Sequence, residues 1–261
     1  MSETIDTSRD KAGRVAIVAS NPAVSPVTGW PIGFWWSELT HAYWEFVQSG
    51  YETSVFSPNG GGLTADPWSD PRDKSGYSSD DLISLGFIHS PRHMKLVEDS
   101  RPLADLHVAD CDAVLLVGGQ APMVTFHDDA RILELVATFY EAEKMAAVLC
   151  HATSVLLEAR LSTGALLVEG KTWTGFANSE EQAAEAFVGR KIQPFWIEDQ
   201  ARRLPDTRFV VKDAFVPHAV RDGFLVTGQQ QHSASAAARL VIEALDSRRA
   251  NAGQRPEGRL R

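Results

Sequence analysis

Cysteine is scarce in this chain, which holds only Cys111 and Cys150 among its 261 residues. Small secreted domains without a large core usually rely on several disulfides. Both cysteines fall in apolar runs typical of buried strands, so we do not expect a disulfide framework. We expect the protein to occupy a reducing compartment. Residues 1–6 also lack the apolar stretch of a signal peptide. We therefore expect a cytoplasmic protein.

Basic clusters and long apolar runs are lacking as well. Lys and Arg do not gather outside the C-terminal tail, and the formal net charge is −9. Proteins that bind nucleic acid usually present a basic patch, and an acidic surface is repelled by anionic membranes. No apolar run approaches the roughly 20 residues of a membrane span. The sequence therefore predicts neither a nucleic-acid partner nor a membrane partner.

Metal and dinucleotide motifs are also missing. His89, His93 and His107 stand without a ligand pattern such as HExxH. No GxGxxG follows the first predicted strand, so the isolated Gly-Gly pair at 118–119 is not a dinucleotide fingerprint. The sequence predicts no metal site.

Short apolar strands instead alternate with amphipathic helices along most of the chain. Such alternation is typical of an α/β fold with a mostly parallel sheet covered on both faces. We predict one domain over residues 14–246, with flexible tails at 1–13 and 247–261. The predicted strands are 14–20, 52–57, 111–117, 145–149 and 224–227, and the predicted helices are 33–47, 128–143 and 235–244.

One long segment, residues 58–105, breaks this alternation. It is rich in Pro, Gly, Ser and Asp, with modest helical character near 80–85 and 92–97. Long insertions in compact domains are more often functional than idle. We interpret it as a cap or lid.

The apolar run 145–149 leads directly into Cys150, and a helix-forming run follows at 155–160. A cysteine between a buried strand and a helix meets free backbone N–H groups, which favour the thiolate. Ligands of α/β proteins also bind at the carboxyl ends of strands. A buried structural thiol is the alternative, but this position favours a nucleophile or redox-active thiol.

Glu38 and the glycine pair fall in connections that also follow strands, so right-handed crossovers place them at the same sheet edge as Cys150. The Gly118-Gly119 turn can present backbone N–H groups to an oxyanion. The His151 N–H is a second donor, and we expect Glu38 to share a proton with the thiol.

Aromatic residues lie just before Glu38 in the sequence. Trp35 and Trp36 precede Glu38 and predict an apolar environment, which would raise the pKa of its carboxyl. His151 could in turn pair with a downstream carboxylate, either Glu180 or Glu181. Both could instead simply begin a helix, where acidic residues are favoured.

These residues belong to an ordered set of motifs. The set consists of Gly33-Phe34-Trp35-Trp36-Ser37-Glu38-Leu39, Ser57-Pro58-Asn59-Gly60-Gly61, Gly118-Gly119 before Pro122-Met123, Cys150-His151, Thr174-Gly175-Phe176 with Glu180-Glu181, Pro194-Phe195-Trp196-Ile197-Glu198, and Thr227-Gly228-Gln229. The order resembles the ThiJ/PfpI superfamily of class I glutamine-amidotransferase-like proteins. The likeness is greatest to its branch of heat-shock chaperones and glutathione-independent glyoxalases, over roughly residues 14–246.

This resemblance implies a flavodoxin-like three-layer sandwich with Cys150 at a strained nucleophile elbow. It implies Glu38 as the proton partner, a triad completed by His151 and Glu181, and an oxyanion hole made by the N–H groups of Gly119 and His151. It also implies a homodimer and no cofactor. The reaction of that branch converts methylglyoxal and water to lactate.

Two departures from the family's usual pattern lie at the pocket mouth. Residues 152–154 are Ala-Thr-Ser where Gly-Pro is usual, and Gln120 replaces a common His. The substrate, a small reactive carbonyl compound or another electrophile, is therefore left open, and the Trp-rich segment favours a larger or more aromatic one. Alternatives are a hydratase, hydrolase or lyase acting on an isonitrile or amide, and a holdase chaperone or stress sensor in which Cys150 is oxidised to the sulfinic acid.

Overall fold

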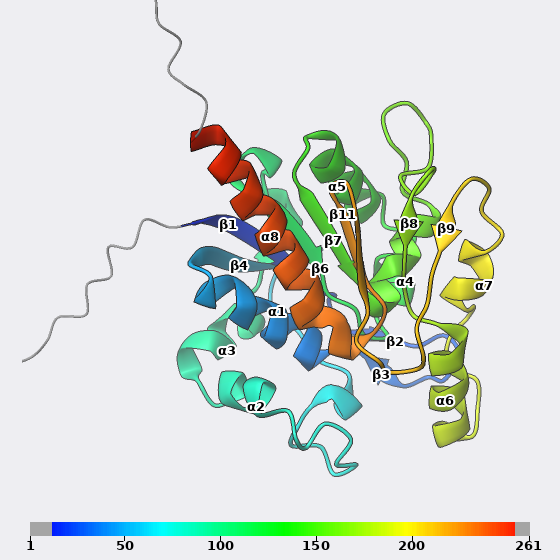
Figure 1. Ribbon diagram of the computed structural model, residues 1–261. Coiled ribbons are helices and arrows are strands. Elements are labelled where there is room, and N and C mark those ends of the chain that lie inside the picture. The colour runs from blue at the N-terminus through cyan, green and yellow to red at the C-terminus, as the bar shows by residue number, and fades with distance from the viewer. Residues whose placement is uncertain (1–11, 254–261) are drawn as a thin grey trace, which may run out of the picture.

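A computed structural model describes residues 12–253, and its centre is a seven-stranded β-sheet (Figure 1). The strand order is β10-β11-β7-β6-β1-β4-β5, and every neighbouring pair is parallel except β10 with β11. The strands are β1 (Gly13–Val18), β4 (Tyr51–Ser57), β5 (Arg101–Pro102), β6 (Ala113–Leu116), β7 (Met145–Leu149), β10 (Ala219–Asp222) and β11 (Leu225–Gly228). Two smaller sheets pair β2 (Ala23–Val24) with β3 (Pro31–Ile32), and β8 (Thr172–Trp173) with β9 (Arg208–Phe209).

The strands in the middle of the sheet are apolar along nearly their whole length. Every residue of β6 and β7 is buried, and Ile17 of β1 is paired with Val55 on one side and Leu115 on the other. A parallel strand with helices on both faces has no solvent-facing side. This is why these strands are continuous apolar runs in the sequence.

Helices cover both faces of the sheet and complete three layers. On one face α1 (Trp36–Gln48) packs against α8 (Ala234–Gly253), which also contacts β7 and β11. Figure 1 shows these two helices in front of the sheet and α5 (Ala130–Glu141) behind it, where α5 contacts β6 and β7. The predicted flavodoxin-like sandwich with a mostly parallel sheet is confirmed. The other helices are η3 (Val108–Asp110), α4 (Pro122–Thr125), η4 (Cys150–Leu157), α6 (Asn178–Val188), α7 (Ile197–Ala201) and η5 (Gln231–Ser233).

The last helix continues beyond its predicted end. α8 runs to Gly253, so residues 247–253 are helical rather than part of a flexible tail. Their arginines have partners on the body of the domain, since the guanidinium of Arg248 lies 5.1 Å from the ring centroid of Phe224 and that of Arg249 lies 4.9 Å from that of Tyr51. At the other end of the chain Gly13, predicted to belong to the N-terminal tail, is the first residue of β1. Residues 1–11 and 254–261 of the predicted tails lie outside the described residues.

The insertion at 58–105 is built onto the edge of the sheet. Its β5 pairs with β4, and its α2 packs against α1. Figure 1 shows it as the cyan segment below α1. Its helices are η1 (Pro67–Ser69), α2 (Leu82–Ile88), α3 (Pro91–Glu98) and η2 (Leu103–Asp105). Within residues 12–253 no helix has both the length and the apolar character needed to cross a membrane.

Candidate active site

Cys150 is the first residue after β7, at the carboxyl edge of the sheet. Its side chain is buried, and its backbone φ is 52°, in the left-handed region. For a residue other than glycine this conformation costs about 1–3 kcal/mol and persists only where the surrounding structure imposes it. The strained elbow expected at this turn is therefore present.

A helix follows β7, as predicted, but it is the 3-10 helix η4, which begins at Cys150 itself and ends at Leu157. The hydroxyl of Thr153 donates to the carbonyl oxygen of Cys150 at 2.6 Å. This side-chain bond competes for an acceptor that a regular α-helix would use. All eight residues of η4 are buried, so packing determines its path.

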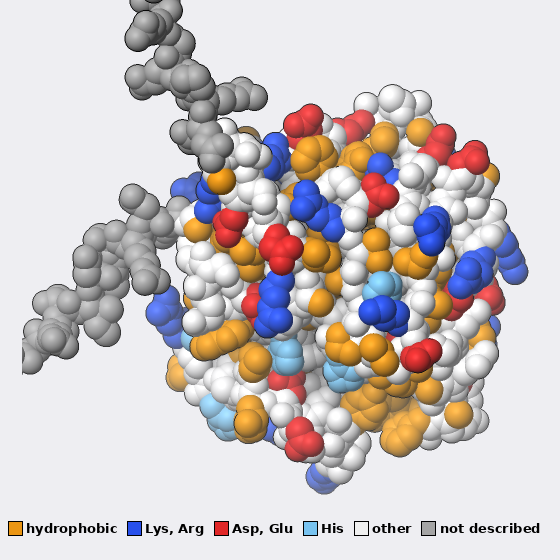
Figure 2. Space-filling model, viewed as in Figure 1, with side chains coloured by type: hydrophobic (Ala, Val, Ile, Leu, Met, Phe, Trp, Pro, Cys, Tyr) orange, Lys and Arg blue, Asp and Glu red, His pale blue; other side chains and the backbone are white. Residues whose placement is uncertain are grey.

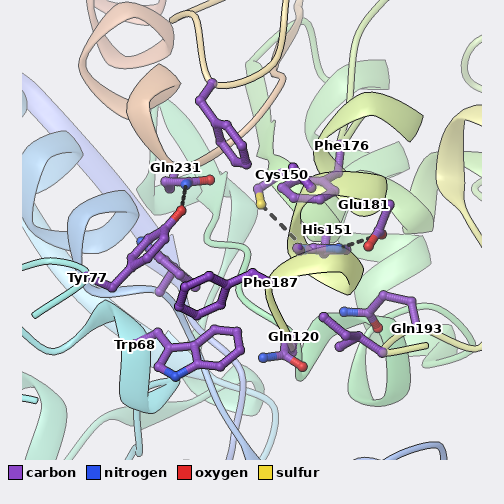
Figure 3. Close-up of a pocket in the computed structure, with 15 residues that line it drawn as sticks. Trp68, Tyr77, Gln120, Cys150, His151, Phe176, Glu181, Phe187, Gln193 and Gln231 are labelled. Atoms are coloured by element: carbon purple, nitrogen blue, oxygen red, sulfur yellow. Dashed lines mark hydrogen bonds and ion pairs between the residues drawn. The ribbon is translucent and has the colours of Figure 1, made fainter. Parts of the chain in front are cut away.

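His151 connects Cys150 to Glu181 (Figure 3). Its Nδ1 lies 3.5 Å from Cys150 Sγ, and its Nε2 lies 2.9 Å from Glu181 Oε1. The ring of Phe176 stacks on the imidazole, with centroids 4.0 Å apart. These contacts fix the orientation of the imidazole. Of the two acidic candidates, the structure brings Glu181 to His151.

Glu180 has a different position, although it is adjacent in α6. It accepts hydrogen bonds from Ala177 N–H at 2.9 Å, Phe215 N–H at 3.0 Å and Gln229 Nε2 at 2.8 Å. It does not line the cavity above Cys150. The prediction of Glu180 as a pocket residue is therefore wrong, because the start of α6 turns this side chain toward the backbone around it.

The carboxylate of Glu181 also governs the protonation of His151. Burial alone lowers the pKa of the imidazole, but Glu181 beside it raises the pKa, and the net change is upward from the ordinary value. An opposite charge at hydrogen-bond distance stabilises the protonated form. Glu181 thus makes the His151 imidazole, next to the sulfur atom, a stronger base than an isolated histidine.

Glu38, in the first turn of α1, is completely buried near Cys150. Its Oε2 accepts the Gly118 N–H at 2.7 Å, and its Oε1 has no well-formed hydrogen bond with any described residue. Burial raises the pKa of Glu38 to about 7, while the Cys150 thiol and the Gly118 N–H lower it. The carboxyl can therefore hold or release a proton near neutral pH.

The thiol of Cys150 is not activated in the way the sequence suggested. Burial raises its pKa well above the ordinary value, and the neighbouring Glu38 raises it further. The backbone N–H of His151 lowers the pKa but is outweighed. Burial and Glu38 therefore oppose the thiolate that the sequence predicted at this turn, and a base such as Glu38 is needed to remove the thiol proton.

The Gly118-Gly119 turn packs directly against Cys150 and Glu38. A Cβ on Gly118 would lie 2.7 Å from both Cys150 Cβ and Glu38 Oε2, so only glycine fits there. The Gly118 N–H is occupied by Glu38 and is not free for an oxyanion. Gly119 has a φ of 106°, and its N–H donates to no group among the described residues. Gly119 thus remains the candidate donor of this turn.

Asp66 is a site residue that the sequence analysis did not identify. It lies in the insertion, is completely buried, and accepts the Gly33 N–H at 2.9 Å and the Gln120 N–H at 2.6 Å. Burial raises its pKa to about 7, and the two N–H groups lower it. Asp66 therefore ties the loop before α1 to the Gly118-Gly119 turn. Its neighbours in the sequence gave no signal of this role.

A cavity of about 250 Å³ opens above Cys150. Trp35 and Gln120 line it, as predicted (Figure 3). Trp36 does not, and its prediction as a pocket residue is wrong. As the first residue of α1, Trp36 points into the core, with its ring centroid 4.9 Å from that of Phe34.

Much of the cavity wall comes from aromatic residues that the sequence did not assign to the site. They are Trp68 and Tyr77 of the insertion, Phe187 of α6, and Phe176 and Phe215. Gln231, which stands in a polar run after β11, also lines the cavity. The insertion is thus part of the site wall, a role consistent with a cap.

No group of three or more His, Cys, Asp or Glu residues within the described chain could hold a metal ion. Cys111 lies just before β6, at the opposite end of that strand from the Gly118-Gly119 turn, and it does not line the cavity. Its pKa is raised by burial. Cys150 is therefore the thiol to which the cavity leads.

Residues 36–244 match the sequence profile of the DJ-1/PfpI family. A Schizosaccharomyces pombe protein named "Probable glutathione-independent glyoxalase hsp3104" is 25% identical over 154 residues, which are 59% of this chain and 69% of that protein. Its relative hsp3103, with the same description, is 23% identical over 155 residues. These are 58% of this chain and 59% of hsp3103, less than two thirds of its length.

Solved structures resemble the fold over nearly the whole chain. The Rapid Encystment Protein 24 kDa of Francisella tularensis superposes with a TM-score of 0.79 at 23% identity, covering 89% of this chain and 99% of that one. Glyoxalase III of Candida albicans superposes with a TM-score of 0.71 at 20% identity, covering 89% and 97%. At these identities the likeness establishes the fold alone.

Proposed function

This chain belongs to the DJ-1/PfpI family, and on that premise we propose that it is a cysteine-dependent enzyme converting a 2-oxoaldehyde and water to a 2-hydroxy acid. The supporting observation is the position of Cys150 between Glu38 and the His151–Glu181 pair, beneath a cavity. The glyoxalase names of two relatives are consistent with this reaction.

In the first step the sulfur of Cys150 attacks the aldehyde carbon. The thiol proton passes to the Glu38 carboxylate, whose pKa of about 7 permits transfer in either direction. The new C–S bond forms as the carbonyl electrons move to oxygen, giving a hemithioacetal. The Gly119 and His151 N–H groups are the donors proposed to stabilise that oxygen.

In the second step a proton moves between the two carbon atoms. His151 is the proposed base, because its Nδ1 is the nitrogen closest to the sulfur. It removes the proton from the former aldehyde carbon while the Glu38 carboxyl gives the thiol proton to the ketone oxygen, which produces an enediolate. His151 then returns its proton to the neighbouring carbon. The first carbon is thereby oxidised and the second reduced, so no external oxidant or cofactor is needed.

The third step releases the product. The intermediate is now a thioester of Cys150 with a 2-hydroxy acid. Water attacks the thioester carbon and gives a proton to the Glu38 carboxylate, the C–S bond breaks, and Glu38 returns that proton to the sulfur. Overall, water is the only reactant besides the 2-oxoaldehyde.

The test is turnover of methylglyoxal without glutathione and with a metal chelator, followed as lactate by chromatography. The wild type is compared with Cys150→Ser, Glu38→Gln and the control Cys111→Ser. We expect the first two variants to lose at least about 100-fold in kcat/KM, and the control to retain it. Full activity of Cys150→Ser would refute the proposed nucleophile.

A matched assay separates catalysis from a chaperone role. Suppression of aggregation of a heat-denatured client should survive Cys150→Ser if the protein acts as a holdase. Assembly as a homodimer and a cytoplasmic location remain predictions from the sequence.

A further inference from the structure

The cavity above Cys150 has two chemically different ends. Cys150 and the His151–Glu181 pair lie at one end, whereas Trp68, Tyr77 and Phe187 form the opposite wall, with Gln231 beside Tyr77 and Gln120 beside Trp68 (Figure 3). A bound 2-oxoaldehyde must place its two carbonyl groups at the sulfur end. Its remaining substituent then extends toward the aromatic wall.

The aromatic wall is continuous across three separate segments of the chain. The ring centroids of Trp35 and Tyr77 are 6.0 Å apart, those of Tyr77 and Phe187 are 6.4 Å apart, and those of Phe187 and Trp68 are 5.5 Å apart. The first and last pairs are edge to face. Aromatic rings favour this arrangement with one another, so a further ring on a ligand finds matching partners.

Phe187 is the least expected member of this wall, because 66% of its surface is exposed. Figure 2 shows hydrophobic side chains gathered at the lower right, beside α6. A contiguous patch of exposed apolar side chains at the rim of a cavity is typical of a binding site, and Phe187 forms such a patch with the rings of Tyr77 and Trp68. The exposure of Phe187 is explained if a ligand covers it.

Backbone strain also supports an aromatic side of the cavity. Phe215 lines the cavity with a φ of 62°, which is rare for a bulky residue. Its N–H is held by the buried carboxyl of Glu180 at 3.0 Å. The fold thus maintains a strained conformation that keeps this ring at the cavity.

The polar inventory of the cavity argues against an anionic substituent on the substrate. No Lys or Arg lines it among the described residues. Glu181 is engaged by His151, and the Gln231 amide donates to the Tyr77 hydroxyl at 3.2 Å. A phosphate or carboxylate on the substrate would therefore lose its water without gaining a cationic partner.

Building on the proposed function, we propose that the preferred substrate is an aryl-substituted 2-oxoaldehyde, whose ring lies among Trp68, Tyr77 and Phe187. Methylglyoxal has only a methyl group to offer this wall and leaves most of the 250 Å³ cavity unfilled. The bond changes are those given above. Phenylglyoxal and water give mandelate, with the aldehyde carbon oxidised and the ketone carbon reduced.

The test compares kcat/KM for phenylglyoxal and methylglyoxal, with mandelate and lactate measured as products. We expect the wild type to prefer phenylglyoxal by at least about tenfold, since a single additional methylene in an apolar pocket already changes kcat/KM by roughly 10- to 200-fold. Phe187→Ala should reduce that preference by about tenfold. Trp44→Ala is the matched control, because Trp44 is an exposed aromatic residue of α1 outside the cavity.

An equal or greater kcat/KM for methylglyoxal in the wild type would overturn the inference while leaving the proposed function intact. So would a Phe187→Ala variant that slows both aldehydes equally. Absence of turnover of both aldehydes would instead refute the proposed function. Binding of the unreactive ketone acetophenone, followed by tryptophan fluorescence, then decides: saturable binding weakened by Phe187→Ala supports an aromatic site, and no binding overturns it.

Discussion

The backbone N–H of Gly118 donates to Oε2 of Glu38 at 2.7 Å, joining two residues that are 80 positions apart. The same glycine lies so close to Cys150 that a Cβ would be 2.7 Å from its Cβ atom. One glycine therefore sets the distance between the proposed nucleophile and its proton partner. The site depends on the absence of a side chain here.

Gly118→Ala is expected to disable the site. The added methyl group must displace Glu38 or Cys150, so we predict a loss of at least about 100-fold in kcat/KM and of about 1–3 kcal/mol in the free energy of unfolding. Turnover and denaturant unfolding measure these effects. Gly86→Ala is the control, because its Cβ would lie in open space within α2. A Gly118→Ala variant as active as this control would contradict the geometry.

Glu181 and Glu180 are expected to respond differently to substitution by glutamine. Glu181→Gln removes the charge that raises the pKa of His151, so burial should leave that pKa lower. Turnover should fall by about 100-fold or more. Histidine chemical shifts titrated by NMR report the pKa directly.

Glu180→Gln is the matched variant. Glutamine cannot accept all three hydrogen bonds that Glu180 accepts, so its main effect should be a lower Tm. A larger change in the His151 pKa for Glu180→Gln than for Glu181→Gln would reverse these assignments.

The pH dependence of turnover should reflect Glu38. Because burial raises the pKa of Glu38 to about 7, the carboxylate that accepts the thiol proton becomes populated as the pH rises through 7. We predict that kcat/KM increases with pH and has an inflection near 7. In Glu38→Gln the residual activity should lack this inflection. An unchanged profile in that variant would assign the inflection to another group.

The same carboxyl should make the folded state less stable at alkaline pH. Its pKa rises on folding from 4.5 to about 7, so the folded state binds more protons between these pH values. The free energy of unfolding must then fall as the pH increases through this range. The contribution is on the order of 3 kcal/mol at full ionisation.

Glu38→Gln removes this contribution while keeping an acceptor for the Gly118 N–H. Urea unfolding of wild type and variant at pH 5 and pH 8 measures it. We expect the stability of the variant relative to the wild type to increase with pH. A constant difference would show that Glu38 does not change its pKa on folding.

The sheet and the position of Cys150 could be predicted because apolar runs bounded by turns are local signals. The direction in which neighbouring residues at the start of a helix point could not be predicted. Trp35 lines the cavity while Trp36 is in the core, and the outcome depends on where α1 begins. Glu180 and Glu181 differ for the same reason at the start of α6. Adjacent residues in a helix point about 100° apart, so an error of one residue exchanges their roles.

Residues of the insertion could not be assigned from the sequence because their partners are distant and their surroundings are irregular. Tyr77 meets Gln231 across 154 positions. The upward shift of the Cys150 pKa could not be predicted from the sequence either, since it comes mainly from burial and from Glu38. Both causes depend on packing that no local pattern reveals.

Asp66 is the positioning residue that this packing creates, and its substitution provides a sharp test. Each of its two oxygens accepts one N–H, from Gly33 at 2.9 Å and from Gln120 at 2.6 Å. Asparagine has a single acceptor oxygen, so Asp66→Asn leaves one buried N–H facing an amide NH₂ group. We predict a loss of about 1–3 kcal/mol in stability and a fall of about tenfold or more in kcat with a smaller change in KM.

Asp66→Asn should keep the inflection near pH 7, because Glu38 and not Asp66 is the proposed proton partner of the sulfur. Loss of the inflection would identify Asp66 as the titrating group, since burial raises its pKa to about 7 as well. Asp70→Asn is the control. Asp70 pairs with nearby Arg72 in an exposed turn, and such surface pairs contribute about 0–1 kcal/mol. Equal effects of the two substitutions on kcat would show that Asp66 does not position the turn beside Cys150.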